Sequence, residues 1–149
     1  MKRLAVVLVL AGAALAGCGG KSNLSKSAYQ QRLQADAKPV GQLISSLSKN
    51  PPKTLTQLVT RLDQAEATAK KAADDLAASK PPADVAADNA ALVAGLRKVQ
   101  SALEQVKANP AAAASIIGTI EKAPAIKNAE KALADLKSKG YSVGALGLP

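Results

Sequence analysis

Apolar residues recur every three or four positions along most of the chain after residue 27, which is the spacing of one face of an α-helix. Prolines divide this pattern into segments. The clearest segments are residues 54–79, which begin at a Thr54/Gln57 capping-box spacing, and residues 83–108. Their apolar stripes are Leu55, Leu58, Leu62, Ala65, Ala69, Ala72 and Leu76, and Val85, Asn89, Leu92, Leu96, Val99, Leu103 and Val106.

These two segments are equally long and a short turn containing Pro81 and Pro82 joins them, which predicts an antiparallel helical hairpin. Both stripes are predicted to belong to the core, with the alanine-rich end of the first facing the start of the second. Asn89 is the one polar residue on these stripes. We interpret it as a residue that sets the helix register or lies at the stripe's edge; the alternative is a binding group inside the bundle.

Two further helical regions flank the hairpin. Residues 27–48 begin at a capping-box spacing of Ser27 and Gln30, and Pro39 should kink this helix or split it. Residues 110–140 contain Pro124, which either separates two helices or kinks one. The fold class is therefore predicted to be all-α, an up-down helical bundle of four to five helices.

The ends of the last region carry local signals of their own. Asn109 and Pro110 have the form of a helix start, and Gly140 that of a helix end. The tail, residues 141–149, includes Leu146 and Leu148 and either packs back as a lid or stays loose.

The first 18 residues follow a different pattern. Lys2 and Arg3 precede an apolar run, residues 4–16, which has the length of a signal-peptide core and is short for a membrane span. The run closes on Leu15-Ala16-Gly17-Cys18, with the only cysteine of the chain. This resembles the lipobox of bacterial lipoproteins, and as a whole the chain is similar to their small, alanine-rich helical members.

The resemblance implies cleavage before Cys18, a diacylglycerol on its sulfur, and export. The protein would then be anchored to the cell membrane, or to an outer membrane where the source has one. The expected organisation is a signal peptide at 1–17, a lipidated cysteine with its tether at 18–26, the bundle at 27–140 and the tail at 141–149.

Composition narrows the chemistry. The chain has no His, Trp or Phe and only two Tyr, and lipidation of Cys18 removes the one thiol. Ser–His–Asp and Cys–His catalytic groups and Cys/His zinc sites are therefore excluded, and no glycine-rich nucleotide-binding motif occurs. Too few aromatic residues remain to stack nucleic-acid bases. We expect no enzyme activity, no cofactor, no metal and no nucleic-acid partner.

Charge indicates one kind of contact. Removal of Lys2 and Arg3 leaves 18 basic against 11 acidic residues, a net charge of +7. For an exported protein this favours anionic lipid or cell-wall polymer as a partner, although basic residues also keep a helical surface soluble. The candidate contacts are the clusters Lys70, Lys71, Arg97, Lys98, Lys127 and Lys131.

The chain has two carboxylate groupings, Asp74-Asp75 and Asp84/Asp88. Asp84 and Asp88 share a helix face, one turn apart. We interpret them as a solvated first turn that complements the helix dipole; the alternative is an acid/base pair or a cation grip.

These observations predict a non-catalytic, membrane-anchored envelope lipoprotein that presents a helical binding or scaffolding surface. The alternative is a carrier that holds a hydrophobic ligand between alanine-lined helices. A sizeable apolar cavity distinguishes the two, because a compact scaffolding bundle should lack one.

Overall fold

The structure is a computed structural model that describes residues 23–50 and 52–144, with the backbone alone for residues 44, 45, 47 and 48. The predicted signal peptide, Cys18 and tail residues 145–149 lie outside this part. Within it, short 3₁₀ turns at Ala83–Val85 and Pro110–Ala112 lead into two of the five helices. The helices are α1 (Lys26–Lys49), α2 (Leu55–Ala78), α3 (Ala86–Ala108), α4 (Ala113–Glu121) and α5 (Pro124–Ser138). The all-α helical bundle is thus confirmed.

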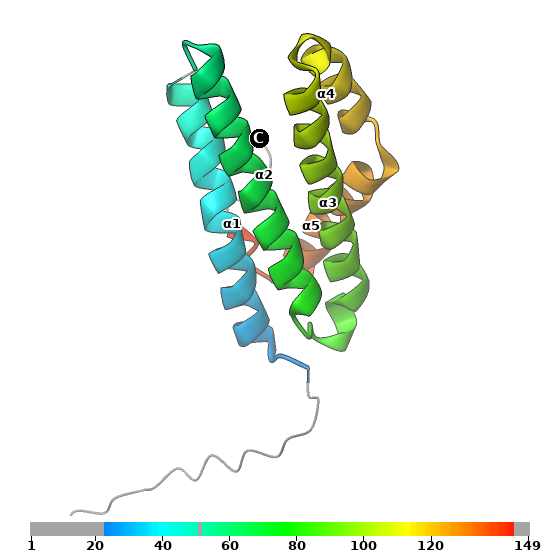
Figure 1. Ribbon diagram of the computed structural model, residues 1–149. Coiled ribbons are helices and arrows are strands. Elements are labelled where there is room, and N and C mark those ends of the chain that lie inside the picture. The colour runs from blue at the N-terminus through cyan, green and yellow to red at the C-terminus, as the bar shows by residue number, and fades with distance from the viewer. Residues whose placement is uncertain (1–22, 51, 145–149) are drawn as a thin grey trace, which may run out of the picture.

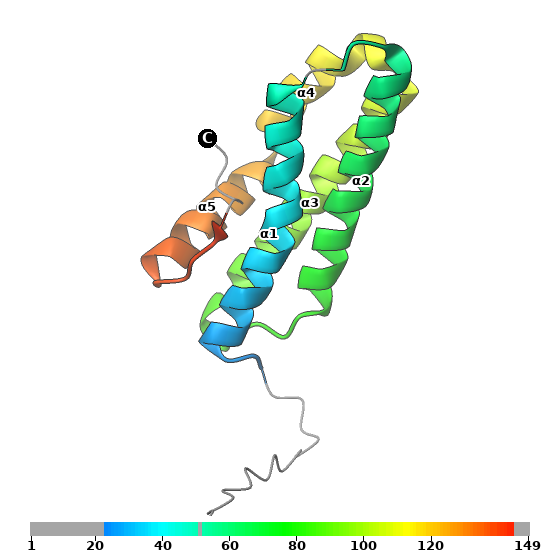
Figure 2. The same ribbon diagram turned by 90° about the vertical axis from the view of Figure 1, so that its left-hand side faces the viewer.

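The first three helices alternate in direction (Figure 1). α2 and α3 converge at the turn between them, as the predicted hairpin requires, and diverge toward their other ends. α4 turns back from the far end of α3, and α5 then packs against the half of α3 nearer the α2–α3 turn (Figure 2). The helices therefore enclose one end of the molecule more completely than the other.

Local capping explains several helix ends. The Thr54 hydroxyl accepts a hydrogen bond from the Gln57 amide at 3.2 Å, as the sequence predicts. Gly140 adopts a φ of 75°, and the Tyr141 amide donates to the Leu136 carbonyl at 2.9 Å, which closes α5 with a glycine C-cap. The predicted cap of the first helix was wrong: Ser25 caps α1, because its hydroxyl accepts from the Ala28 amide.

Pro39 and Pro124 have different effects on the helices that contain or adjoin them. α1 continues through Pro39 as one helix. Pro124 instead begins a separate helix, because α4 ends at Glu121 and Pro124 occupies the first position of α5, where its missing amide costs nothing.

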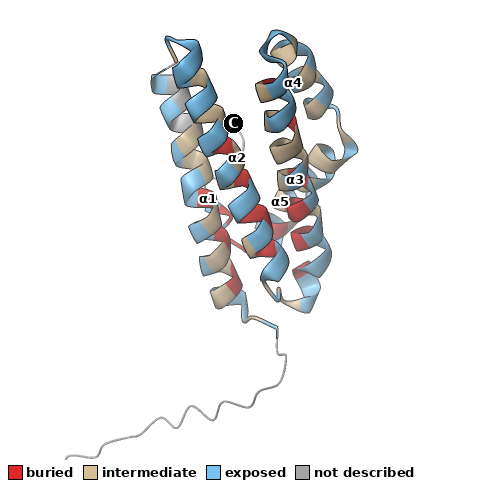
Figure 3. Ribbon diagram, viewed as in Figure 1, coloured by how far each residue is buried: buried red, intermediate tan, exposed pale blue. Residues whose placement is uncertain are grey.

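The core lies in the half of the bundle near the α2–α3 turn (Figure 3). The largest fully buried side chains come from α1, α2, the turn before α3, and α5: Tyr29, Leu33, Leu76, Val85 and Leu136. Tyr141 and Val143 are also buried, and the Tyr141 ring packs edge-on against Tyr29 with 5.9 Å between centroids. Residues 141–144 therefore pack back onto the bundle.

The prediction that both stripes belong to the core is correct for only part of each stripe. Leu55, at the start of α2, is 65% exposed. Leu62, Leu96, Val99 and Leu103 are only half-buried. The helical period is the same at these positions as at Leu76, but α2 and α3 diverge toward this end of the molecule (Figure 1).

A chain shortened to residues 21–149 is expected to fold without the preceding segment, because the buried core side chains among the described residues belong to residues 29–143. It should be soluble, strongly helical by circular dichroism, and unfold in urea in a single cooperative transition. A gradual, non-cooperative loss of helix would contradict this expectation.

Candidate functional site: an apolar cavity

Four helices surround a cavity of about 280 Å³ that adjoins the core. This volume is just below the range of typical ligand pockets, which is about 300–1,000 Å³. α1 contributes Val40 and Leu43, and α2 contributes Ala65, Thr68 and Ala69. The lining residues of α3 are Leu92, Gly95, Leu96, Val99 and Leu103, and those of α5 are Ile126, Ala129, Glu130 and Leu133. Most of these side chains are half-buried, so the cavity is open to solvent on one side.

The lining is almost wholly hydrocarbon. Thr68 and Glu130 are its only residues with polar side chains. The Thr68 hydroxyl donates to the carbonyl of Gln64 in its own helix at 2.7 Å, and Glu130 is exposed. An apolar cavity of this kind binds apolar molecules, because water inside it finds few hydrogen-bond partners.

Small residues shape the cavity by bringing helices close at one end. At Gly95 a Cβ atom would lie only 2.6 Å from the Cβ of Ala129, so α3 and α5 cross in near contact. Ala65 and Ala69 are buried and leave space that larger side chains would fill. The alanine-lined half of the predicted α2 stripe is therefore both a helix contact and one wall of the cavity.

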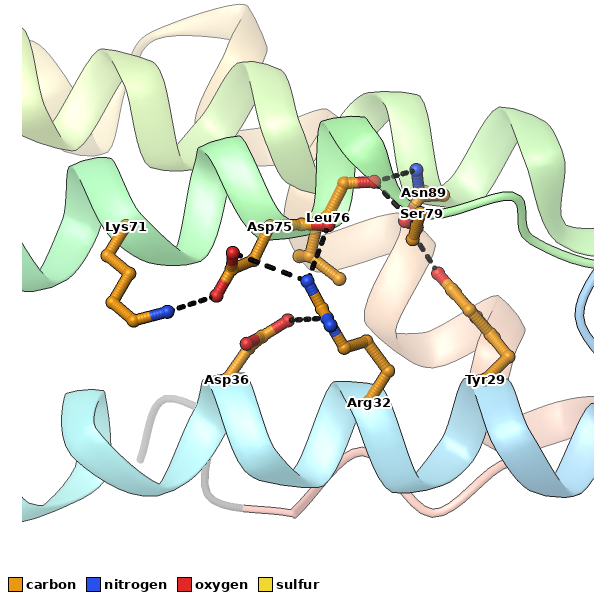
Figure 4. Close-up of polar contacts among 8 residues, drawn as sticks. All are labelled: Tyr29, Arg32, Asp36, Lys71, Asp75, Leu76, Ser79 and Asn89. Atoms are coloured by element: carbon orange, nitrogen blue, oxygen red, sulfur yellow. Dashed lines mark hydrogen bonds and ion pairs between the residues drawn. The ribbon is translucent and has the colours of Figure 1, made fainter.

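Asn89 is buried in the core, three residues before Leu92, where the α3 lining of the cavity begins. Its side-chain amide nitrogen donates to the Leu76 carbonyl at 3.0 Å, and its oxygen accepts from the Tyr29 hydroxyl at 2.9 Å (Figure 4). Burial raises the pKa of Tyr29, which keeps this hydroxyl protonated as a donor. Both ends of the Asn89 amide thus join α1, α2 and α3, as expected of a residue that sets the register.

A cluster of charged residues that the sequence analysis missed joins α1 to α2 (Figure 4). Arg32 lies 3.4 Å from the Asp36 carboxylate and 3.3 Å from that of Asp75, and Lys71 pairs with Asp75. Burial raises the pKa of Asp36, while the hydrogen bond from Lys71 lowers that of Asp75. Arg32 and Asp36 are four positions apart, and this spacing predicts an ion pair within one helix. No local pattern predicts the contact of Arg32 with Asp75 on α2.

The six predicted surface cations lie in pairs on three helices, α2, α3 and α5. Lys70 and Lys71 each form an ion pair with an aspartate one turn later on α2, Asp74 and Asp75. Arg97 and Lys98 lie on α3, the first exposed and the second half-buried, and Lys127 and Lys131 are exposed on α5. Carboxylates thus partly neutralise the α2 cluster, which weakens it as an anion contact.

The prediction that Asp84 and Asp88 form a solvated acidic turn is correct for Asp84, which is exposed, and wrong for Asp88. Asp88 is buried, and the Lys139 ammonium lies 2.7 Å from its carboxylate and also donates to the Asp84 carbonyl. This hydrogen bond to Asp88 raises the pKa of Lys139. The arrangement pins the end of α5 to the start of α3.

Two other kinds of site are absent from the part of the chain that the structure describes. His, Cys, Asp and Glu side chains do not gather there in groups of three that would hold a metal ion. None of its helices is both long and apolar enough to span a bilayer.

Comparison of the chain with known protein families, with curated proteins and with solved structures gives no match.

Proposed function

We propose that this protein is a carrier that holds a hydrophobic ligand in the cavity between α1, α2, α3 and α5, and that Cys18 anchors it to a membrane of the cell envelope. The cavity is the observation that carries the proposal: four helices surround about 280 Å³ of space with hydrocarbon side chains. A bundle that acts only as a scaffold gains stability by closing such a space, since buried apolar contacts stabilise the fold.

The cavity also limits the ligand. Its volume suits a single hydrocarbon chain or a small apolar ring system better than a lipid with two full chains. The polar part of such a ligand would remain at the open side, because the lining offers no buried hydrogen-bonding group to receive it. The anchor and the envelope location rest on the N-terminal segment alone.

Ligand binding can be tested with the uncharged fluorophore N-phenyl-1-naphthylamine and the chain of residues 21–149. We expect saturable binding with a rise in fluorescence, because the dye leaves water for an apolar site. Ala69→Leu, which fills part of the cavity, should weaken binding at least about tenfold, equivalent to about 1.4 kcal/mol. Thermal unfolding of each variant verifies that it is folded.

Ala77→Leu is the matched control, because Ala77 lies on the same helix but is exposed. Its affinity for the dye should equal that of the unmodified chain. The carrier function is contradicted if binding does not saturate, or if both substitutions change the affinity equally. A scaffolding surface would then be the better proposal.

A further inference from the structure

α4 is an apolar helix that the fold leaves largely uncovered. Its nine residues include Ile116, Ile117 and Ile120, and Glu121 at its end is its only charged residue. No residue of α4 is buried, and Ile117 is 53% exposed. Burying an isoleucine contributes about 1.5–3 kcal/mol, so the isolated protein forgoes a stabilisation that a partner surface would supply.

The start of α2 has the same character. Leu55 is 65% exposed and Val59, one turn later on the same face, is 38% exposed. Together with Ile117 they are the exposed large hydrophobic residues among the side chains that the structure describes. Single exposed apolar residues are common, but their concentration at one end of a molecule indicates an interaction surface.

Both views place the start of α2 and α4 at the same end of the molecule, opposite the start of α1 (Figures 1 and 2). We call this end, with Leu55, Val59, Ile117, Lys49 and Lys53, the apical surface. The chain segments that form it, residues 43–50, 52–62 and 105–120, contain four basic residues, and three acidic residues, Asp63, Glu104 and Glu121, directly adjoin their ends. One of the four, Lys107, is paired with Asp63 and Glu66 farther along α2.

The remaining charge identifies the kind of partner. Lys49 and Lys53 are exposed at the α1–α2 turn, next to the exposed leucine and valine. Exposed aliphatic residues beside lysines are typical of surfaces that enter the boundary between headgroups and acyl chains of an anionic bilayer. Protein interfaces, in contrast, are depleted in lysine at their centre and enriched in aromatic residues, which this surface lacks.

We propose that the apical surface docks on an anionic lipid bilayer, with Leu55, Val59 and Ile117 in the headgroup boundary and Lys49 and Lys53 against lipid phosphates. The docking needs no ligand in the cavity, so it and the carrier function can fail separately. It also differs from attraction by total charge, because it assigns the contact to one end of the molecule.

The test is sedimentation of the chain of residues 21–149 with vesicles of phosphatidylcholine containing phosphatidylglycerol. Each lysine at such a surface contributes roughly fivefold in affinity, so Lys49→Gln/Lys53→Gln should weaken binding roughly twenty-five-fold at low salt. Leu55→Ser/Ile117→Ser should weaken it by at least about tenfold without loss of helix, because both side chains are exposed. Lys127→Gln/Lys131→Gln, on α5, is the matched control and should change binding less than about fivefold.

A second readout locates the contact. The chain contains no tryptophan, so Ile117→Trp introduces a single reporter at the apical surface. Its emission should shift to the blue on anionic vesicles and be quenched by brominated acyl chains, whereas Ala134→Trp, at an exposed site of α5, should show neither change. Absence of vesicle binding, equal losses for the two lysine pairs, or an unquenched tryptophan at position 117 would each overturn the proposal.

Discussion

Leu76→Asp is expected to lower the free energy of unfolding by about 4 kcal/mol or more, which is a large part of the stability of a small domain. Leu76 is completely buried in the last turn of α2 and belongs to the core cluster that also contains Tyr29, Val85 and Leu136. An aspartate there would lose the apolar contacts and place an unpaired carboxylate in the core. Urea unfolding followed by circular dichroism measures the change.

Leu62→Asp is the matched comparison, because Leu62 lies on the same stripe two heptads earlier but is half-buried. The carboxylate can reach water there, so the loss should be less than half of that for Leu76→Asp. Equal losses at the two positions would show that the core extends along the whole stripe, and the position of the core described above would be wrong.

The helix boundaries were largely predictable because their causes are local. Thr54 and Gly140 act within one turn of the residues they cap. Pro81 and Pro82 lie just after the end of α2 at Ala78 and prevent the helix from continuing. Ser25 was missed in favour of Ser27, because both serines precede the same apolar pattern and only the backbone conformation distinguishes them.

Burial along the helices was less predictable, because it depends on which helix covers each position. Leu62 and Leu76 occupy equivalent heptad positions, yet only Leu76 is fully buried. The difference arises from the divergence of the helix pairs and from the position of α5, which crosses α3 at Gly95 and Ala129. The same divergence creates the cavity. The alanines of its lining could be identified from the sequence, but the cavity itself could not be predicted.

The charged contacts between helices were the least predictable. Lys139 and Asp88 are 51 positions apart, and Arg32 and Asp75 are 43 apart. Neither spacing has a local signature, so the sequence identified Asp84 and Asp88 as an acidic pair without the lysine that binds Asp88. The ion pair between Lys70 and Asp74 differs, because these residues are one turn apart on α2 and that spacing is a local signal.

Cys18→Ser is expected to abolish covalent lipidation and with it stable membrane retention of the processed protein. Under the proposed function, two acyl chains on the Cys18 diacylglycerol hold the protein at the bilayer. One acyl chain gives only marginal, reversible binding and two give a stable anchor, so removing both chains removes the stable anchor. The measurements are the intact mass of the protein and its distribution between membrane and soluble fractions.

Ser22→Ala, four residues after the cysteine, is the matched control and should retain both the lipid mass and the membrane fraction. The uncleaved apolar segment of residues 4–16 can itself hold a precursor at the membrane, so the fractionation is read together with the mass. Loss of the lipid mass from Cys18→Ser, with either an uncleaved precursor or a soluble product, supports the anchor. The anchor is refuted if the unsubstituted protein shows no diacylglycerol mass increment and Cys18→Ser is retained at the membrane equally well. The cavity and the apical surface would then be tested on their own.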